Sequence, residues 1–129
     1  MCADFTACPD PLARAPRAGG RASVLIAPPS LQGALSAVVW RDTAGLALNA
    51  AQKLNHFPAT PLVCLSWFQG MDIGLIESSE GGAPRWRPLD AALTWSGSQS
   101  RPLVSWSPSV GRAGMACFPV DVAHALFGV

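Results

Sequence analysis

The sequence predicts a mainly β domain: a barrel or a double-sheet sandwich of six to eight short strands with a short C-terminal helix. Two observations lead to this prediction. Short runs of apolar, β-branched and aromatic residues recur along the chain, and Gly, Pro and Ser clusters separate them. Residues 62–69 alternate between two faces, as a strand does. With 129 residues, half of them apolar, the chain is long enough to bury one core.

The chain divides into a leader and one folded domain. Residues 1–21 mix Ala, Pro, Gly and Arg without any period, so we expect a flexible leader there. The β domain is expected over residues 22–129. Composition does not divide this stretch further, and one domain is the usual outcome for a chain of this length.

The first part of the domain is the least regular. Residues 24–26 form a short β-type run that two prolines end. Residues 30–43 begin with a serine suited to capping a helical turn. They continue into Val38-Val39-Trp40, whose side chains favour a strand. Residues 46–52 are rich in Ala and Leu, and either a helix or an extended segment fits them.

A pair of strands is expected in the middle of the chain. Residues 62–69 are largely apolar on both faces, so this strand should be covered on both sides. Gly70 follows, and residues 72–77 are expected to return as the second strand of a hairpin. Residues 78–88 contain two glycines and two prolines, which predicts a long turn.

The last part predicts three strands and a helix. Residues 92–96 and 103–107 flank a corner, where Gly97 permits a tight turn of the backbone because it has no side chain. Residues 112–118 alternate as a final strand. A helix should follow from Pro119 and end near Phe127, because proline fits a first helical turn and glycine fits the position after the last.

Charge and hydropathy argue against contact with nucleic acid or a membrane. The net charge is +1, and Lys53 is the only lysine, so no basic stripe for phosphates is formed. No apolar window approaches the ~18 residues of a membrane-spanning helix, and no signal-peptide core is present. Four cysteines without a C-x-x-C pair fit reduced cytosolic thiols. We therefore expect a cytoplasmic protein.

The residues for catalysis or metal binding are sparse. Only His56 and His124 carry an imidazole, whereas a catalytic metal usually has three protein ligands. No G-x-S-x-G nucleophile motif occurs. Cys64 and His56 would form a thiol–imidazole pair only if the fold joined them. The sequence therefore predicts no catalytic residue, no metal site and no cofactor.

Six residues are candidates for contact with a ligand, each with a structural alternative. Tryptophans either fill a core or line an apolar pocket. Gln99 and Arg101 either hold a ligand, Arg101 favouring an acidic one, or fix the corner by local hydrogen bonds. His56 either contacts a ligand or is a hydrogen-bonded residue at a rim. The full set of candidates is His56, Trp67, Gln69, Trp95, Gln99 and Arg101.

Three patches of the chain, taken in order and spacing, resemble the N-terminal domain of AraC-type transcription regulators. They are Phe57-Pro58-Ala59-Thr60-Pro61 running into residues 62–68 and Gly70, then Gly97-Ser98-Gln99-Ser100-Arg101-Pro102, then Phe118-Pro119-Val120-Asp121 with Ala125-Leu126-Phe127-Gly128. The resemblance extends over about residues 22–129. It implies a cupin-like β domain that senses a small-molecule effector or mediates dimerisation.

The resemblance also implies a helix-turn-helix half that this chain does not contain. We expect a truncated regulator, an excised domain or a stand-alone sensor, with self-association and with no direct contact to DNA. The alternative is a small cupin-like enzyme acting on a metabolite, against which the scarcity of histidines argues. A third interpretation is a fragment whose exposed faces drive self-association.

Overall fold

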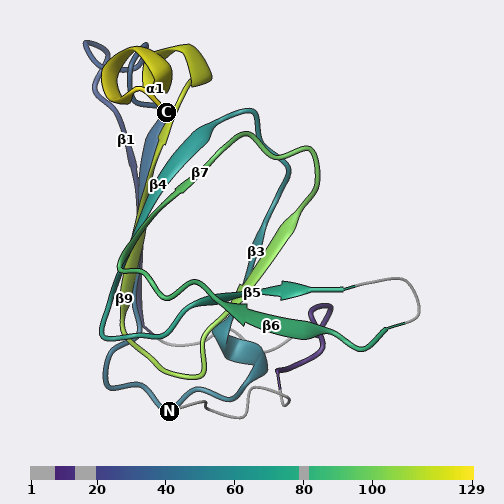
Figure 1. The fold of residues 1–129 in the computed structure, drawn as a ribbon. Helices are drawn as coiled ribbons and strands as arrows, with labels where there is room; N and C mark the ends of the chain where they lie inside the picture. The colour runs from purple at the N-terminus through teal and green to yellow at the C-terminus, as the bar shows by residue number, and fades with distance from the viewer. Residues whose placement is uncertain (1–7, 14–19, 79–81) are drawn as a thin grey trace.

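The computed structural model describes residues 8–13, 20–78 and 82–129. Within them the chain forms two antiparallel β-sheets and a short C-terminal helix, so the mainly β prediction is confirmed and the architecture is that of a β-sandwich (Figure 1). Sheet A has the spatial order β1 (Arg21–Ile26), β2 (Ala37–Asp42), β9 (Arg112–Phe118), β4 (Val63–Gln69) and β7 (Leu93–Ser96). Sheet B has the order β3 (Leu54–Phe57), β8 (Leu103–Trp106), β5 (Gly74–Glu77) and β6 (Arg85–Pro88).

Successive strands of this chain mostly lie in different sheets. Of the connections between the described strands, only β1 to β2 and β5 to β6 stay within one sheet. All the others pass from sheet A to sheet B or back. These connections link the two sheets to each other at both ends of the sandwich. They also place side by side some loops that are far apart in the sequence.

The register of sheet A assigns each residue to a face. Trp40, Gly114 and Trp67 are directly opposite one another across β2, β9 and β4, so their side chains share a face. Arg41 lies on the other face and reaches sheet B, where its guanidinium donates to Asn55 Oδ1 at 3.1 Å and to the Gln52 carbonyl at 3.3 Å. The tryptophans therefore occupy the outer face of sheet A.

Sheet B carries a buried aromatic cluster made of Leu54, Ile76, Trp86 and Trp106. The two indole rings meet edge to face, 5.8 Å between centroids. Trp86 Nε1 donates to the Trp106 carbonyl at 2.8 Å, and Trp106 Nε1 donates to the Ala50 carbonyl at 2.9 Å. Both indole N–H groups are satisfied, which removes the cost of burying them.

The described part of the leader covers this cluster. Cys8 and Ala13 pack against it. Leader residues 1–7 and 14–19, for which flexibility was expected, lie outside the described residues. β1 begins at Arg21, one residue before the expected start of the domain.

Two expectations about the middle of the chain were wrong. Residues 62–69 and 72–77 do not form a hairpin, because β4 pairs with β9 on one edge and β7 on the other, and no edge is left for β5. Residues 78–88 were expected to be a long turn, yet β6 occupies their end and buries Trp86. A single apolar residue between two arginines gives no alternation to detect, and pairing with β5 supplies the strand.

Most of the other elements agree with the sequence to within a few residues, but β3 was not expected, and the described strands number nine rather than six to eight. Residues 46–50 form neither an α-helix nor a strand, and a 3₁₀ turn at Ala51–Lys53 leads into β3. β9 has the expected bounds. Helix α1 (Val120–Phe127) follows Pro119 and ends at Gly128, whose φ of 69° is left-handed. Among the described residues, no helix is long and apolar enough to cross a bilayer.

Gly114 should tolerate no side chain. A Cβ atom at this position would overlap the Trp67 ring, whereas a Cβ atom on Gly97 would meet nothing within 4 Å. We expect Gly114→Ala to lower the free energy of unfolding by about 1–3 kcal/mol through overpacking. Gly97→Ala, the matched control, should leave it unchanged or raise it by up to about 1 kcal/mol. Urea unfolding followed by tryptophan emission measures both, and equal effects would contradict this account of the Trp67 contact.

Candidate functional site

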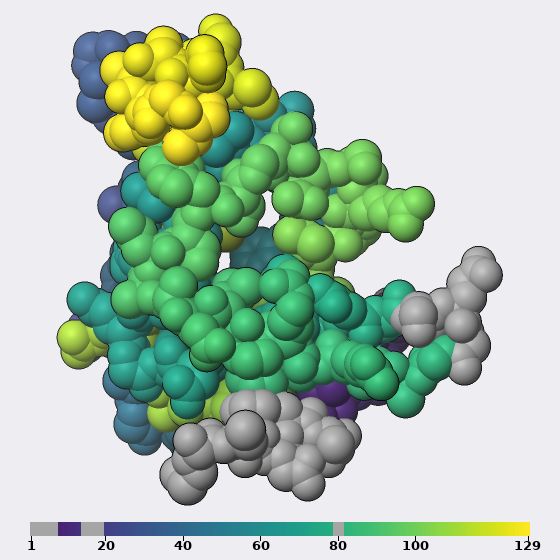
Figure 2. All heavy atoms as spheres, in the orientation of Figure 1, coloured from purple at the N-terminus to yellow at the C-terminus, as the bar shows by residue number. Residues whose placement is uncertain are grey.

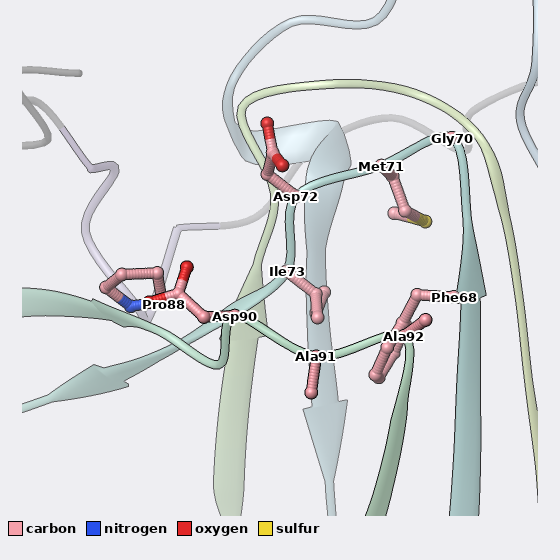
Figure 3. Close-up of a pocket in the computed structure, with 9 residues that line it drawn as sticks. All are labelled: Phe68, Gly70, Met71, Asp72, Ile73, Pro88, Asp90, Ala91 and Ala92. Atoms are coloured by element: carbon pink, nitrogen blue, oxygen red, sulfur yellow. The ribbon is translucent and has the colours of Figure 1, made fainter. Parts of the chain in front are cut away.

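A cavity lies where two connections cross between the sheets side by side. One is residues 70–73, between β4 and β5, and the other is residues 89–92, between β6 and β7. The cavity has a volume of about 440 Å³, within the range of about 300–1,000 Å³ for small-molecule sites. Its lining residues, shown in Figure 3, are Phe68, Gly70, Met71, Asp72, Ile73, Pro88, Asp90, Ala91 and Ala92.

Backbone hydrogen bonds hold the cavity walls in place. Leu89 N donates to the Ile73 carbonyl at 2.9 Å, which joins the two connections. Phe68 N donates to the Ala92 carbonyl at 2.9 Å, which joins β4 to the second connection. Asp72 N donates to Ser109 Oγ at 3.0 Å. These bonds within the chain restrict the movement of the walls, which lowers the entropic cost of binding a ligand.

The lining combines apolar side chains with two exposed aspartates. In Figure 3 the Met71 side chain points toward Phe68, whose ring lies beside Ala92, and the exposed carboxylates of Asp72 and Asp90 point away from these side chains. None of the lining residues is a lysine, arginine or histidine. Such a lining favours a ligand with an apolar body and a cationic or hydrogen-bond-donating group, and it repels an anion.

The structure places three of the predicted ligand residues on the outer face of sheet A. Trp67 and Gln69 project from β4 on the side away from sheet B, and Trp95 shares that face because it pairs with Leu65. None of the six candidates lines the cavity. Phe68, between Trp67 and Gln69, points inward instead. A role in binding for the six residues remains a prediction.

The two polar corner residues differ in their environment. Gln99 uses its side-chain amide to donate to the Gly97 carbonyl at 3.1 Å, the local bond that was one of its two alternatives. Its backbone forms an isolated β-bridge with Thr60 through two hydrogen bonds of 2.8 and 3.0 Å. The bridge joins the β7–β8 connection to the β3–β4 connection. Arg101 is exposed at the same corner.

His56 contacts the leader rather than Cys64. Its Nε2 lies 2.6 Å from the Pro11 carbonyl oxygen, so that nitrogen carries the proton and donates. Cys64 lies in the other sheet and faces Cys117. The fold therefore does not form a thiol–imidazole pair. Within the described ranges, no three His, Cys, Asp or Glu side chains group to hold a metal ion.

A second feature is the apolar surface formed by the edge strand β7 and helix α1. Four of its side chains are largely exposed: Leu93 (59%), Trp95 (39%), Leu126 (63%) and Phe127 (48%). The Trp95, Phe118 and Phe127 rings form a cluster with centroids 5.1 to 6.3 Å apart, which fixes the helix on the strand. Figure 2 shows the yellow helix resting on the green residues below it. We call these four residues the β7–α1 surface.

Sequence reasoning missed the cavity because its residues have no common pattern. Met71 and Ile73 were assigned to a hairpin, and Ala92 to a strand start. Only the crossing of the two connections brings them together. The exposed end of α1, by contrast, was visible as Leu126-Phe127 in a helix too short to be stable alone.

Comparison with known proteins assigns no family. No family model, no curated protein and no solved structure matches this chain. Its function is therefore inferred from its own residues and from the resemblance noted in the sequence.

Asp90 lines the cavity with its backbone in the left-handed region, at a φ of 51°. Glycine adopts this conformation without the Cβ penalty, so we expect Asp90→Gly to raise the free energy of unfolding by up to about 1 kcal/mol. Asp72→Gly is the matched control, at a φ that is not left-handed, and it should lower stability by roughly 0.5–1 kcal/mol. Thermal unfolding monitored by circular dichroism tests this, and destabilisation by Asp90→Gly would show that its carboxylate has a structural role.

Proposed function

We propose that this chain is the regulatory domain of an AraC-type transcription regulator that binds a small-molecule effector in the cavity and neither catalyses a reaction nor contacts DNA itself. The cavity at the β4–β5 and β6–β7 connections carries this proposal. The order of the three sequence patches and the mainly β fold support it. A cytoplasmic location belongs to the same proposal.

The position of the cavity suggests how binding acts on the domain. Both wall segments connect sheet A to sheet B, so a ligand that contacts them favours one spacing and orientation of the sheets over others. A ligand shifts a conformational equilibrium only by its difference in affinity between the states. Here that difference arises from contacts with Phe68 on one sheet and with Ile73 at the start of the other.

The lining points to an effector that pairs an aromatic or aliphatic group with an amine. Phe68, Met71 and Ile73 provide the apolar contacts, and Asp72 and Asp90 provide negative charge. The charge makes an acidic effector in this cavity unfavourable. An acidic effector at Arg101 would need a different site, on the corner between β7 and β8.

A matched ligand panel tests the effector site. Arylalkylamines are compared with arylalkanoic acids of the same chain length, with thermal unfolding and tryptophan emission as readouts. A binder at 100-fold excess over its Kd should stabilise the domain by about 2.7 kcal/mol. Asp72→Asn/Asp90→Asn should abolish the preference for amines, and Glu77→Gln, outside the cavity, should not. Stabilisation by neither series, or equally by both, would contradict the proposed site.

The β7–α1 surface favours a second role, self-association with another copy of this chain. The surface is apolar, it borders an edge strand, and the net charge of +1 causes little repulsion between copies. A two-fold arrangement would place the surface of one copy against that of the other, as isologous dimers do. Exposed aromatic and aliphatic clusters of this kind commonly mark association sites.

Sedimentation velocity over a range of concentrations tests self-association. Leu126→Glu places a charge on an exposed helix position and should weaken the dimer by about tenfold or more, ~1.4 kcal/mol. Leu12→Glu, at an exposed leucine of the leader, is the control and should have no effect. A chain that stays monomeric at the highest concentration, or a dimer that Leu126→Glu leaves intact, would exclude this surface.

A further inference from the structure

Two buried thiols face each other between the adjacent strands β4 and β9 of sheet A. Cys64 in β4 and Cys117 in β9 are directly opposite in the antiparallel register. Their Sγ atoms are 3.3 Å apart, and both residues are free cysteines. Both lie on the inner face with Phe68, because alternate residues of a strand share a face. They are 53 residues apart in sequence, so only the register joins them.

Their backbone geometry suits a disulfide. Opposed residues in antiparallel strands have Cα atoms about 4.5–5.5 Å apart, and disulfides span about 4.4–6.8 Å. The sulfurs must approach from 3.3 Å to about 2.05 Å. Side-chain rotation and a small shift of two neighbouring strands achieve this, so the fold need not open for the bond to form.

The two thiols also differ in acidity. The Cys64 thiol donates to Cys117 Sγ, and this hydrogen bond lowers the pKa of Cys117 to about 7 although burial opposes the shift. The same bond, together with burial and the nearby negative charge, raises the pKa of Cys64. Cys117 is therefore the thiol of the pair that ionises more readily, and the thiolate is the reactive form of cysteine.

We propose that Cys64 and Cys117 are a redox-modification site, a dithiol that a peroxide converts reversibly into a disulfide joining β4 to β9. The Cys117 thiolate attacks one peroxide oxygen, the O–O bond breaks, and sulfenic acid and hydroxide form. The Cys64 sulfur then attacks the Cys117 sulfur. The S–S bond forms, the S–O bond breaks, and water leaves with the Cys64 proton. Overall, two thiols lose two electrons and hydrogen peroxide becomes two waters.

The pair lies near one end of the sandwich, where an oxidant has the shortest path. Cys64 is the second residue of β4, and Cys117 is the last but one of β9. Across β7, Cys64 pairs with Ser96, which is followed by the corner at residues 97–102. Figure 2 shows a hollow beside the light green residues of this corner. Hydrogen peroxide is little larger than water and can pass where a protein oxidant cannot.

The bond would act on the contacts beneath α1. Val63 and Phe118, the neighbours of the two cysteines, are opposite each other, and the Phe118 ring packs on Trp95 and Phe127. Joining β4 to β9 fixes this pair of strands under the helix. The modification goes beyond the proposed effector site and does not depend on it, because none of its residues lines the cavity.

The test uses the full-length Cys2→Ser/Cys8→Ser variant, in which only the proposed pair remains. The folded protein is treated with hydrogen peroxide, its thiols are counted after unfolding, and its peptides are mapped without reductant. We expect both thiols to be lost together, a linked peptide pair containing Cys64 and Cys117, a change in Trp95 emission, and full recovery with dithiothreitol. The unsubstituted chain should yield the same linked peptides.

Single substitutions provide the control. In Cys64→Ala the remaining Cys117 loses the hydrogen bond that lowers its pKa, so it should react more slowly and stop at sulfenic acid, which dimedone traps. In Cys117→Ala the remaining Cys64 should likewise form no linked peptide. Peroxide that oxidises the urea-unfolded chain but leaves both thiols intact in the folded one would overturn the proposal. So would conversion of Cys117 to sulfinic acid in the double variant without a linked peptide. Neither result depends on whether the alanine variants fold.

Discussion

The register of β9 between β2 and β4 is the constraint on which the rest of the domain depends. It sets Gly114 under the Trp67 ring, Cys117 against Cys64, and Phe118 under α1. A slip of one residue would exchange the faces of every side chain in β9 and would put an alanine or a methionine, depending on its direction, where the Trp67 ring requires glycine. The glycine therefore selects the register as well as permitting it. The dithiol and the ring cluster beneath the helix follow from that selection.

The second constraint is that the chain changes sheets at nearly every connection after β2. Apart from residues 43–53, the crossing segments are short. Neighbouring segments hydrogen bond to one another, Thr60 with Gln99 at one end and Leu89 with Ile73 at the other. Two small sheets make limited contact through their inner faces. The hydrogen bonds between connections add to the contact that holds the sheets together. A cavity remains where the crossing segments carry small side chains, as Ala91 and Ala92 do beside Phe68.

The sequence predicted the elements whose signal is local. β4 and β9 alternate along their whole length, and α1 has its proline and its glycine at the expected ends. Elements defined by their partners were not predictable: β6 depends on β5, and the assumed hairpin failed because β9 and β7 occupy both edges of β4. The cavity and the dithiol were not predicted from the sequence for the same reason. Residues that are 53 positions apart, or that lie in two separate loops, can be identified as neighbours only when the sheet order is known.

Strand β4 joins the two features argued above. Cys64 and Phe68 lie four residues apart on its inner face, the first opposite Cys117 and the second in the cavity wall. A ligand that displaces Phe68 relative to β9 would also change the distance between the sulfurs. By linkage, a disulfide that fixes β4 on β9 would change the affinity of the cavity by the same factor. Because a strand transmits displacement along its length with little compression, four residues are too few to isolate one site from the other. The oxidation state of the dithiol and the occupancy of the cavity would then both shift one conformational equilibrium of sheet A.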